Sequence, residues 1–160
     1  NRITATPMIL AGHSAGAYNA VQLVADQSYL ASVGMSANDI AGIIGLSGPY
    51  DFYPYDVKAT RIAFGDTPAA QSQPVEQDLF HMPPMLLITG NRDHTVYPRN
   101  SRRLAELAPD TKLIEIADTG HAGTLIALGS ILTENREILA PMSKFLTKHL
   151  PAPTKRTDAY

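Results

Sequence analysis

The feature that most constrains the fold is a Gly-x-Ser-x-Gly segment, residues 12–16 (GHSAG), set between two apolar stretches. Residues 8–11 before it form a short apolar run of the kind that makes a fully buried strand. Residues 17–25 after it are mostly apolar, with Asn19 and Gln22 on the more polar side of a helical pattern. The sequence therefore predicts a strand, a tight turn and a helix in direct succession.

A serine on a strained turn between a strand and a helix projects its hydroxyl clear of the backbone, where it can act as a nucleophile. We expect Ser14 to hold this position, with Gly12 and Gly16 leaving room where strand and helix cross too closely for a Cβ. The backbone N–H of Ala15, unsatisfied at the helix start, is expected to point at a developing oxyanion. We expect His13 to pack beside the serine without taking part in chemistry. The alternative is an ordinary turn in which Ser14 caps the helix.

Three further apolar runs are typical of buried strands, and helical patterns lie between and after them. The predicted strands are 40–47, 85–89 and 112–117, and the predicted helices include 58–64, 99–108 and most of the chain after 123, kinked or restarted at Pro141. Strands that alternate with helices predict an α/β fold, a parallel sheet with flanking helices. We expect one domain over residues 1–150 and a loose tail over 151–160.

Composition excludes several classes of function. A formal net charge of −2 gives no electrostatic basis for binding nucleic acid or an anionic membrane. The chain has no cysteine, and its histidines lack metal-ligand spacing, so we expect neither a metal nor a cofactor. No apolar run approaches the roughly 20 residues of a membrane span. Because the chain begins at Asn1, we expect it to be part of a longer protein, which leaves the cellular compartment open.

Two loops that follow predicted strands supply a candidate base and a candidate acid. Acyl transfer by a serine needs a base to take its proton and a group to orient that base. Asp93 follows the strand at 85–89, and His121 follows the strand at 112–117. Since the carboxyl ends of parallel strands open on one edge of a sheet, we expect Ser14, Asp93 and His121 to meet there. Their order along the chain is the one that accompanies a Gly-x-Ser-x-Gly turn.

Each of these candidates also has a structural interpretation. Asp93 is of a type common in turns and helix caps, and His121 could be a plain loop residue. Asp51, after the second predicted strand, is the second candidate for the acid, although it more typically folds its own loop back onto the backbone. Tyr50 and Phe52 follow the same strand and are expected to line a substrate pocket, unless they pack in the core.

Taken together, these segments resemble the C-terminal half of an α/β-hydrolase. The resemblance rests on residues 12–16, Gly48-Pro49-Tyr50-Asp51, Gly90-Asn91-Arg92-Asp93 with Val96-Tyr97-Pro98, and Gly120-His121. It spans residues 8 to about 150 and is closest to carboxylesterases and lipase-like enzymes of the hormone-sensitive-lipase and feruloyl-esterase types. It implies a serine carboxylic-ester hydrolase with Ser14 as nucleophile, His121 as general base, Asp93 as the orienting acid and the Ala15 N–H as one oxyanion donor.

The resemblance also implies the reaction and its alternatives. The expected substrates are small-molecule esters with small, uncharged or aromatic acyl groups, hydrolysed through an acyl-enzyme. A serine peptidase or an acyltransferase of the same fold would use the same three residues. A non-catalytic interaction domain of this fold usually lacks one or more of them, whereas all are present here.

The chain departs from the family in what precedes the serine. Such enzymes carry further strands there, with a His-Gly-Gly-type loop that supplies the remaining oxyanion donors, and the 160 residues contain neither. Loss of one donor typically lowers turnover about 10²–10³-fold, so we expect the isolated chain to have little activity. The run Met8–Ala11 would form an apolar sheet edge open to pairing. We expect an N-terminal half of the protein, or another chain, to cover this edge.

Overall fold

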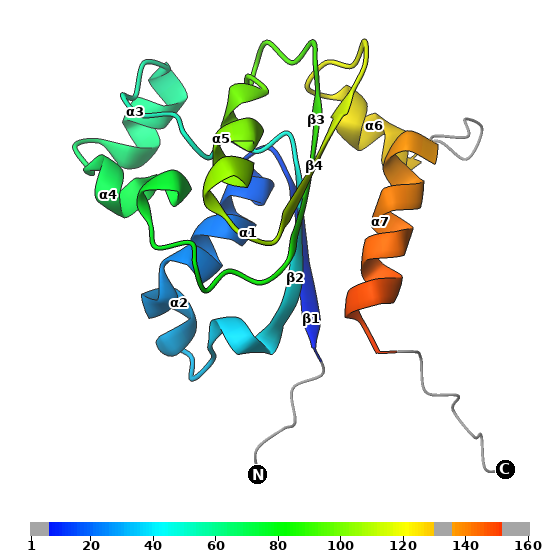
Figure 1. Ribbon diagram of the computed structural model, residues 1–160. Coiled ribbons are helices and arrows are strands. Elements are labelled where there is room, and N and C mark those ends of the chain that lie inside the picture. Colours follow the sequence, from blue (N-terminus) through cyan, green and yellow to red (C-terminus); the bar gives the residue numbers. More distant parts are fainter. Residues whose placement is uncertain (1–6, 130–135, 152–160) are drawn as a thin grey trace, which may run out of the picture.

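The computed structural model describes residues 7–129 and 136–151. Four parallel strands form one sheet in the order β1-β2-β3-β4 (Figure 1), with the bounds Met8–His13, Ile40–Leu46, Met85–Gly90 and Thr111–Ile116. The helices are α1 (Ala15–Ala25), α2 (Gln27–Ala31), α3 (Lys58–Phe64), α4 (Ala69–Ser72), α5 (Arg99–Leu107), α6 (Gly123–Gly129) and α7 (Arg136–His149), with short 3₁₀ turns η1 (Ala37–Asp39) and η2 (Pro74–Glu76). The predicted α/β fold, a parallel sheet with flanking helices, is confirmed.

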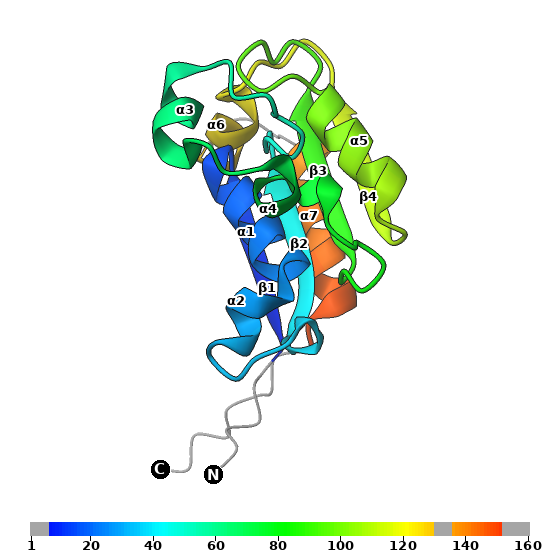
Figure 2. The same cartoon turned by 90° about the vertical axis from the view of Figure 1, so that its left-hand side faces the viewer.

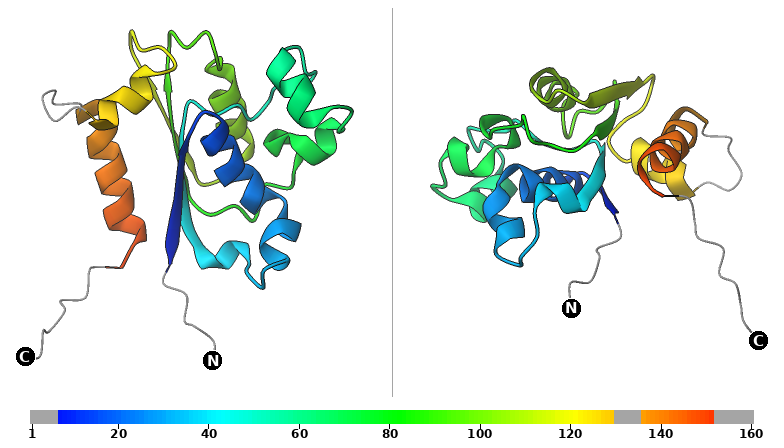
Figure 3. Two further views of the ribbon diagram at one scale, coloured as in Figure 1. Left: turned by 180° about the vertical axis from the view of Figure 1, so that it is seen from behind. Right: turned by 60° about the horizontal axis from the view of Figure 1, so that its bottom comes forward.

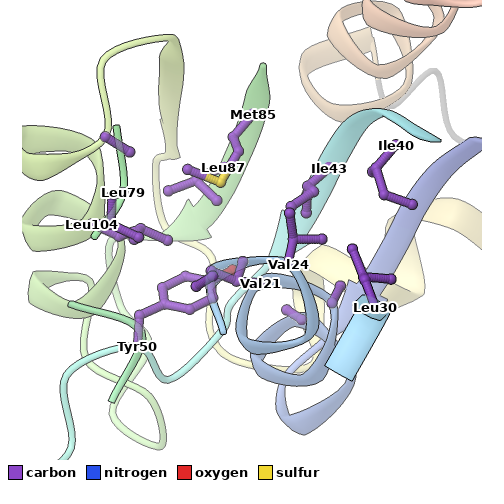
Figure 4. Close-up of a cluster of buried hydrophobic side chains, with 14 residues drawn as sticks. Val21, Val24, Leu30, Ile40, Ile43, Tyr50, Leu79, Met85, Leu87 and Leu104 are labelled. Atoms are coloured by element: carbon purple, nitrogen blue, oxygen red, sulfur yellow. The ribbon is translucent and has the colours of Figure 1, made fainter. Parts of the chain in front are cut away.

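Helices cover both faces of the sheet. Successive residues of a strand point to opposite faces, and the central strands follow this rule closely. In β3, Met85 and Leu87 belong to the hydrophobic cluster under α1 and α5 (Figure 4), and Leu86 and Ile88 belong to the cluster under α6 and α7. The two views of Figure 3 show α6 and α7 on one side of the sheet and α1 on the other. Strands buried on both faces in this way need the continuous apolar runs that the sequence displays.

Strand β1 lies at the edge of the sheet. It pairs with β2 from Met8 to His13, and within the described ranges no strand pairs with its other side. Its side chains are only partly buried, and Met8 at the start of the strand is 40% exposed. That an N-terminal half or another chain covers this edge stays a prediction.

The segment between β2 and β3 places α3 and α4 beyond α1, away from the sheet (Figure 1), so that they face the viewer in Figure 2. Helix α3 has the predicted bounds 58–64, whereas α4 and η2 lie in a stretch for which no element was predicted. That stretch is rich in Gln, Ser and Pro and shows no apolar periodicity, so the pattern gave no signal for these short elements. Pro141 lies within α7, where a kink or a restart was predicted. All of the predicted tail except Pro151 lies outside the described residues.

Tyr50 belongs to the core, and the prediction that it lines a substrate pocket is wrong. Its side chain is fully buried in the cluster of Figure 4, and this burial raises the pKa of its phenol. Two glycines make room for the ring: a Cβ on Gly45 would come within 2.1 Å of the Tyr50 hydroxyl, and one on Gly48 within 2.4 Å. The sequence pattern could not reveal this fit, because it depends on how the ring of a loop residue packs against Gly45, near the end of β2.

A close backbone approach joins β1 to α1. A Cβ on Gly12 would lie 2.3 Å from the carbonyl of Gly16 and 2.6 Å from the nitrogen of Ala17, closer than any side chain tolerates. A Cβ on Gly16 would meet nothing within 4 Å outside its own helix backbone. The prediction that both glycines make room is therefore correct for Gly12 and wrong for Gly16.

We expect Gly12→Ala to destabilise the fold by about 1–3 kcal/mol, the usual cost of forcing extra atoms into a packed site. The matched control is Gly16→Ala, which should leave the free energy of unfolding unchanged or raise it by up to about 1 kcal/mol, since Ala is the better helix former. Chemical denaturation of the two variants checks this. Equal stabilities for the two variants would contradict the close approach at Gly12.

Candidate functional site

Ser14 forms the turn between β1 and α1 with an unusual backbone, φ 55° and ψ −123°. A non-glycine residue rarely adopts such a conformation, which costs of order 1–3 kcal/mol. Its N–H donates to the carbonyl of Leu46 at 2.8 Å, and its own carbonyl accepts from the N–H groups of Ala17 and Tyr18. Its side chain makes no capping hydrogen bond with α1. The alternative of a serine that merely caps the helix is therefore not supported.

The side chains of Ser14, His121 and Asp93 form one hydrogen-bonded row. His121 Nδ1 lies 2.8 Å from Asp93 Oδ2, and His121 Nε2 lies 2.9 Å from Ser14 Oγ. A carboxylate can only accept, so the Nδ1–H donates to Asp93 and leaves Nε2 to accept from the serine hydroxyl. The Asp93 side chain is fully buried, and that of His121 is 20% exposed. The hydrogen-bonded row thus begins at the buried carboxylate of Asp93 and leads to the imidazole of His121, which is partly exposed to solvent.

The loop after β3 holds the Asp93 carboxylate in one orientation. Asp93 Oδ1 accepts from the backbone N–H groups of Thr95 at 2.9 Å and Val96 at 2.8 Å, which leaves Oδ2 for His121. Asp51, the second candidate for the acid, donates its own N–H to Asn100 Oδ1 at 2.8 Å. No hydrogen bond between the Asp51 side chain and His121 occurs in the described part of the chain, so the geometry favours Asp93.

Backbone contacts tie the loops after β3 and β4 to each other. The N–H of Arg92 donates to the carbonyl of Thr119 at 3.0 Å. A Cβ on Gly90 would lie 2.1 Å from that same carbonyl oxygen, so a larger residue there would separate the loops. An exposed ion pair of 2.6 Å joins Arg92 to Asp118. The positions of the Asp93 and His121 side chains are thereby fixed relative to each other.

The backbone carbonyl of His121 is bound by side chains from two other elements. The Nε2–H of His13 donates to it at 3.0 Å, and the hydroxyl of Thr124 donates to it at 3.2 Å. The rings of His13 and His121 lie 4.8 Å apart. Sequence analysis predicted that His13 packs beside the serine but missed this hydrogen bond, because nothing in the sequence links two residues 108 positions apart.

The Ala15 N–H stands beside Ser14 at the start of α1. Within the described ranges it has no hydrogen-bond acceptor, and Ala15 itself is exposed. A free N–H at a helix N-terminus carries partial positive charge and attracts an anion. Its assignment as an oxyanion donor stays a prediction.

An aromatic cluster begins one helical turn after Ser14. The ring of Tyr18 makes edge-to-face contacts with Phe52 and Phe64, with centroid distances of 5.5 and 5.7 Å, and Tyr55 stacks on Phe64 at 5.3 Å. Desolvation by burial and the neighbouring tyrosines Tyr29 and Tyr55 raise the pKa of Tyr18 to about 12, so its phenol is neutral near pH 7. Phe52, predicted to contact substrate, is partly buried within this cluster.

Over residues 7–129 and 136–151, no group of three or more His, Asp or Glu side chains could hold a metal ion. The same residues contain no helix long and apolar enough to cross a membrane.

Comparison with known proteins gives matches among solved structures alone; no protein-family model and no curated protein matches. The apo form of Thermogutta terrifontis esterase 2 is 16% identical at a TM-score of 0.65, over 91% of this chain and 57% of the esterase. A mutant of the esterase E40 is 22% identical at 0.67, over 89% and 53%. Porphyromonas gingivalis dipeptidyl peptidase 4 is 16% identical at 0.68, over 92% and 20%.

These likenesses cover nearly all of this chain but only part of each matched protein. An esterase domain from Rhodothermus marinus is 12% identical at a TM-score of 0.59, and the chain spans 62% of its length. At such low identities the similarity establishes the fold, and with it the arrangement of strands and helices described above. The chain therefore has part of the α/β-hydrolase fold.

Proposed function

We propose that the chain carries the catalytic residues of a serine carboxylic-ester hydrolase. The observation that supports this most directly is the row from Ser14 Oγ through the His121 ring to Asp93, with contacts of 2.9 and 2.8 Å. A strained backbone holds the serine hydroxyl off its own helix, and a buried carboxylate fixes the tautomer of the imidazole. A nucleophile, a base and a group that orients the base are the parts that covalent acyl transfer needs.

In the proposed mechanism, Ser14 Oγ attacks the ester carbonyl while His121 Nε2 takes the hydroxyl proton. Asp93 stabilises the resulting imidazolium through its hydrogen bond to Nδ1–H. The Ala15 N–H donates to the oxyanion of the tetrahedral intermediate. His121 then returns the proton to the leaving alcohol, and an acyl-enzyme on Ser14 remains. Water then attacks the acyl carbonyl while His121 takes the water's proton. The second tetrahedral intermediate breaks its bond to Ser14 Oγ, His121 returns the proton to that oxygen, and the carboxylic acid leaves.

The proposed substrates are esters with small or aromatic acyl groups. The aromatic cluster that begins at Tyr18 supports this choice, because it lies one turn from Ser14 and offers Phe52 as an apolar surface. Aromatic rings favour edge-to-face contacts with other rings, and the cluster already contains two such pairs. Several structural neighbours are named esterases, which supports esters as the substrates without specifying the acyl group.

Replacing the nucleophile should abolish covalent labelling. In the natural full-length protein, a fluorophosphonate probe should label the wild type and leave Ser14→Ala unlabelled, and ester hydrolysis should fall by a factor of about 10⁴ or more. Gel fluorescence and the release of p-nitrophenol measure the two effects. Labelling that survives the substitution would remove Ser14 from this role.

The choice of substrate separates an esterase from a peptidase, the alternative that the likeness to dipeptidyl peptidase 4 raises. We expect p-nitrophenyl acetate and benzoate to be hydrolysed with kcat/KM at least 100-fold above that for dipeptidyl p-nitroanilides. Initial rates at matched concentrations test this in the same full-length protein. Preferential cleavage of the anilides would replace the esterase assignment with a peptidase.

Removing the charge of the acid should cost most of the turnover. We expect Asp93→Asn to lower kcat about 10³–10⁴-fold, because an amide that donates to Nδ1 holds the imidazole in the wrong tautomer. The matched control is Asp51→Asn, which should keep kcat within about twofold, since no hydrogen bond joins Asp51 to His121 in the described structure. Steady-state kinetics decide between the two carboxylates, and the opposite ranking would make Asp51 the acid.

A further inference from the structure

The backbone carbonyl of His121 differs from the neighbouring carbonyls in which groups donate hydrogen bonds to it. The carbonyl of Gly120 accepts from the backbone N–H of Gly123, and that of Ala122 accepts from those of Leu125 and Ile126. In the described part of the chain, no backbone N–H reaches the carbonyl of His121, which accepts only from side chains. The backbone of this residue is thus held by groups that substitution can remove one at a time.

The two donors belong to different elements, α6 and β1. Thr124 is the second residue of α6 and is fully buried; its hydroxyl donates to the carbonyl and accepts from the hydroxyl of Ser47 at 3.0 Å. His13 is the last residue of β1 and precedes Ser14 directly. A single peptide bond therefore joins the residue that anchors the imidazole-bearing loop to the residue that bears the hydroxyl.

We propose that His13 is a positioning residue, which sets the distance between the Ser14 hydroxyl and the His121 ring by holding the His121 carbonyl. This inference rests on the proposed function. The hydrogen bond of 3.0 Å fixes the backbone of His121, and the ring contact of 4.8 Å limits the tilt of its imidazole. The donor is Nε2–H, which both the neutral Nε2–H tautomer and the charged form of His13 provide.

The chemistry explains why a small shift matters. Proton transfer between Oγ and Nε2 needs the atoms within about 2.6–3.2 Å, and the present distance is 2.9 Å. Because Asp93 is held by the loop after β3, a displaced His121 backbone would lengthen the contact to Ser14, the contact to Asp93, or both. Substrate binding would be little affected, since His13 turns toward the loop rather than toward the aromatic cluster.

The test compares His13→Leu, which removes the donor, with His13→Gln, which keeps a side-chain N–H. With p-nitrophenyl acetate and the full-length protein, we expect His13→Leu to lower kcat about 10–100-fold with KM within twofold. His13→Gln should restore kcat to within about fivefold of the wild type.

Thr124→Val combined with His13→Leu should lower kcat by more than the product of the two single losses, because the shared carbonyl then has no donor. Equal kcat for His13→Leu and wild type, or a His13→Gln variant as impaired as His13→Leu, would overturn the proposal.

A second readout is independent of ester hydrolysis. The Nδ1–H proton of His121, hydrogen-bonded to Asp93, should give a far-downfield ¹H NMR signal that persists in the inactive Ser14→Ala variant. We expect this signal to shift or broaden in Ser14→Ala/His13→Leu and to return in Ser14→Ala/His13→Gln. An unchanged signal in all three overturns the positioning role whatever the enzyme's activity. If the wild type does not hydrolyse esters while the signal follows the donor, the proposed function fails and the positioning role stands.

Discussion

The approach of Gly12 to the backbone of Gly16 and Ala17 is the constraint on which the site depends. It lets β1 connect to α1 through a single residue, Ser14. The strain of this turn appears as the positive φ angle of Ser14. The N–H of Ser14 still belongs to the sheet through its bond to Leu46, while its carbonyl already belongs to the helix. Both ends of the residue are therefore fixed by regular structure, which leaves only the side chain free to orient.

The rest of the site is built from loops that regular structure holds in the same way. Asp93 is fixed by two backbone donors in its own loop, and the loop of His121 is fixed by Arg92 from one side and by His13 and Thr124 from the other. A site of this kind needs little reorganisation when charge develops, which is how preorganised polar groups lower a barrier. The side chains proposed to take part in the reaction are few, and most of the neighbouring contacts hold them in place.

The architecture could be predicted from the sequence because the fold follows from apolar periodicity and from the rule that the carboxyl ends of parallel strands lie at one edge of a sheet. Four apolar runs and the helical patterns between them predicted the sheet, and the strand ends indicated where Ser14, Asp93 and His121 would lie. The features that depend on three-dimensional packing could not be predicted in this way. Tyr50 looked like a pocket residue because it follows a strand, yet Gly45 and Gly48 admit its ring to the core. The hydrogen bond from His13 to the carbonyl of His121 could not be predicted from composition or residue spacing. Helix α4 could not be predicted either, because it forms in a stretch without apolar periodicity.

The position of β1 at the edge of the described sheet has a consequence for the chemistry. A strand held by one neighbour retains more freedom to slide and twist than a strand held by two, and His13 and Ser14 are the last residue of β1 and the one directly after it. Whatever docks along that edge would restrain the hydroxyl and the anchor of the imidazole in a single step, without touching either. Pairing of another strand with β1 would then complete the sheet and fix the positions of the proposed catalytic groups at the same time.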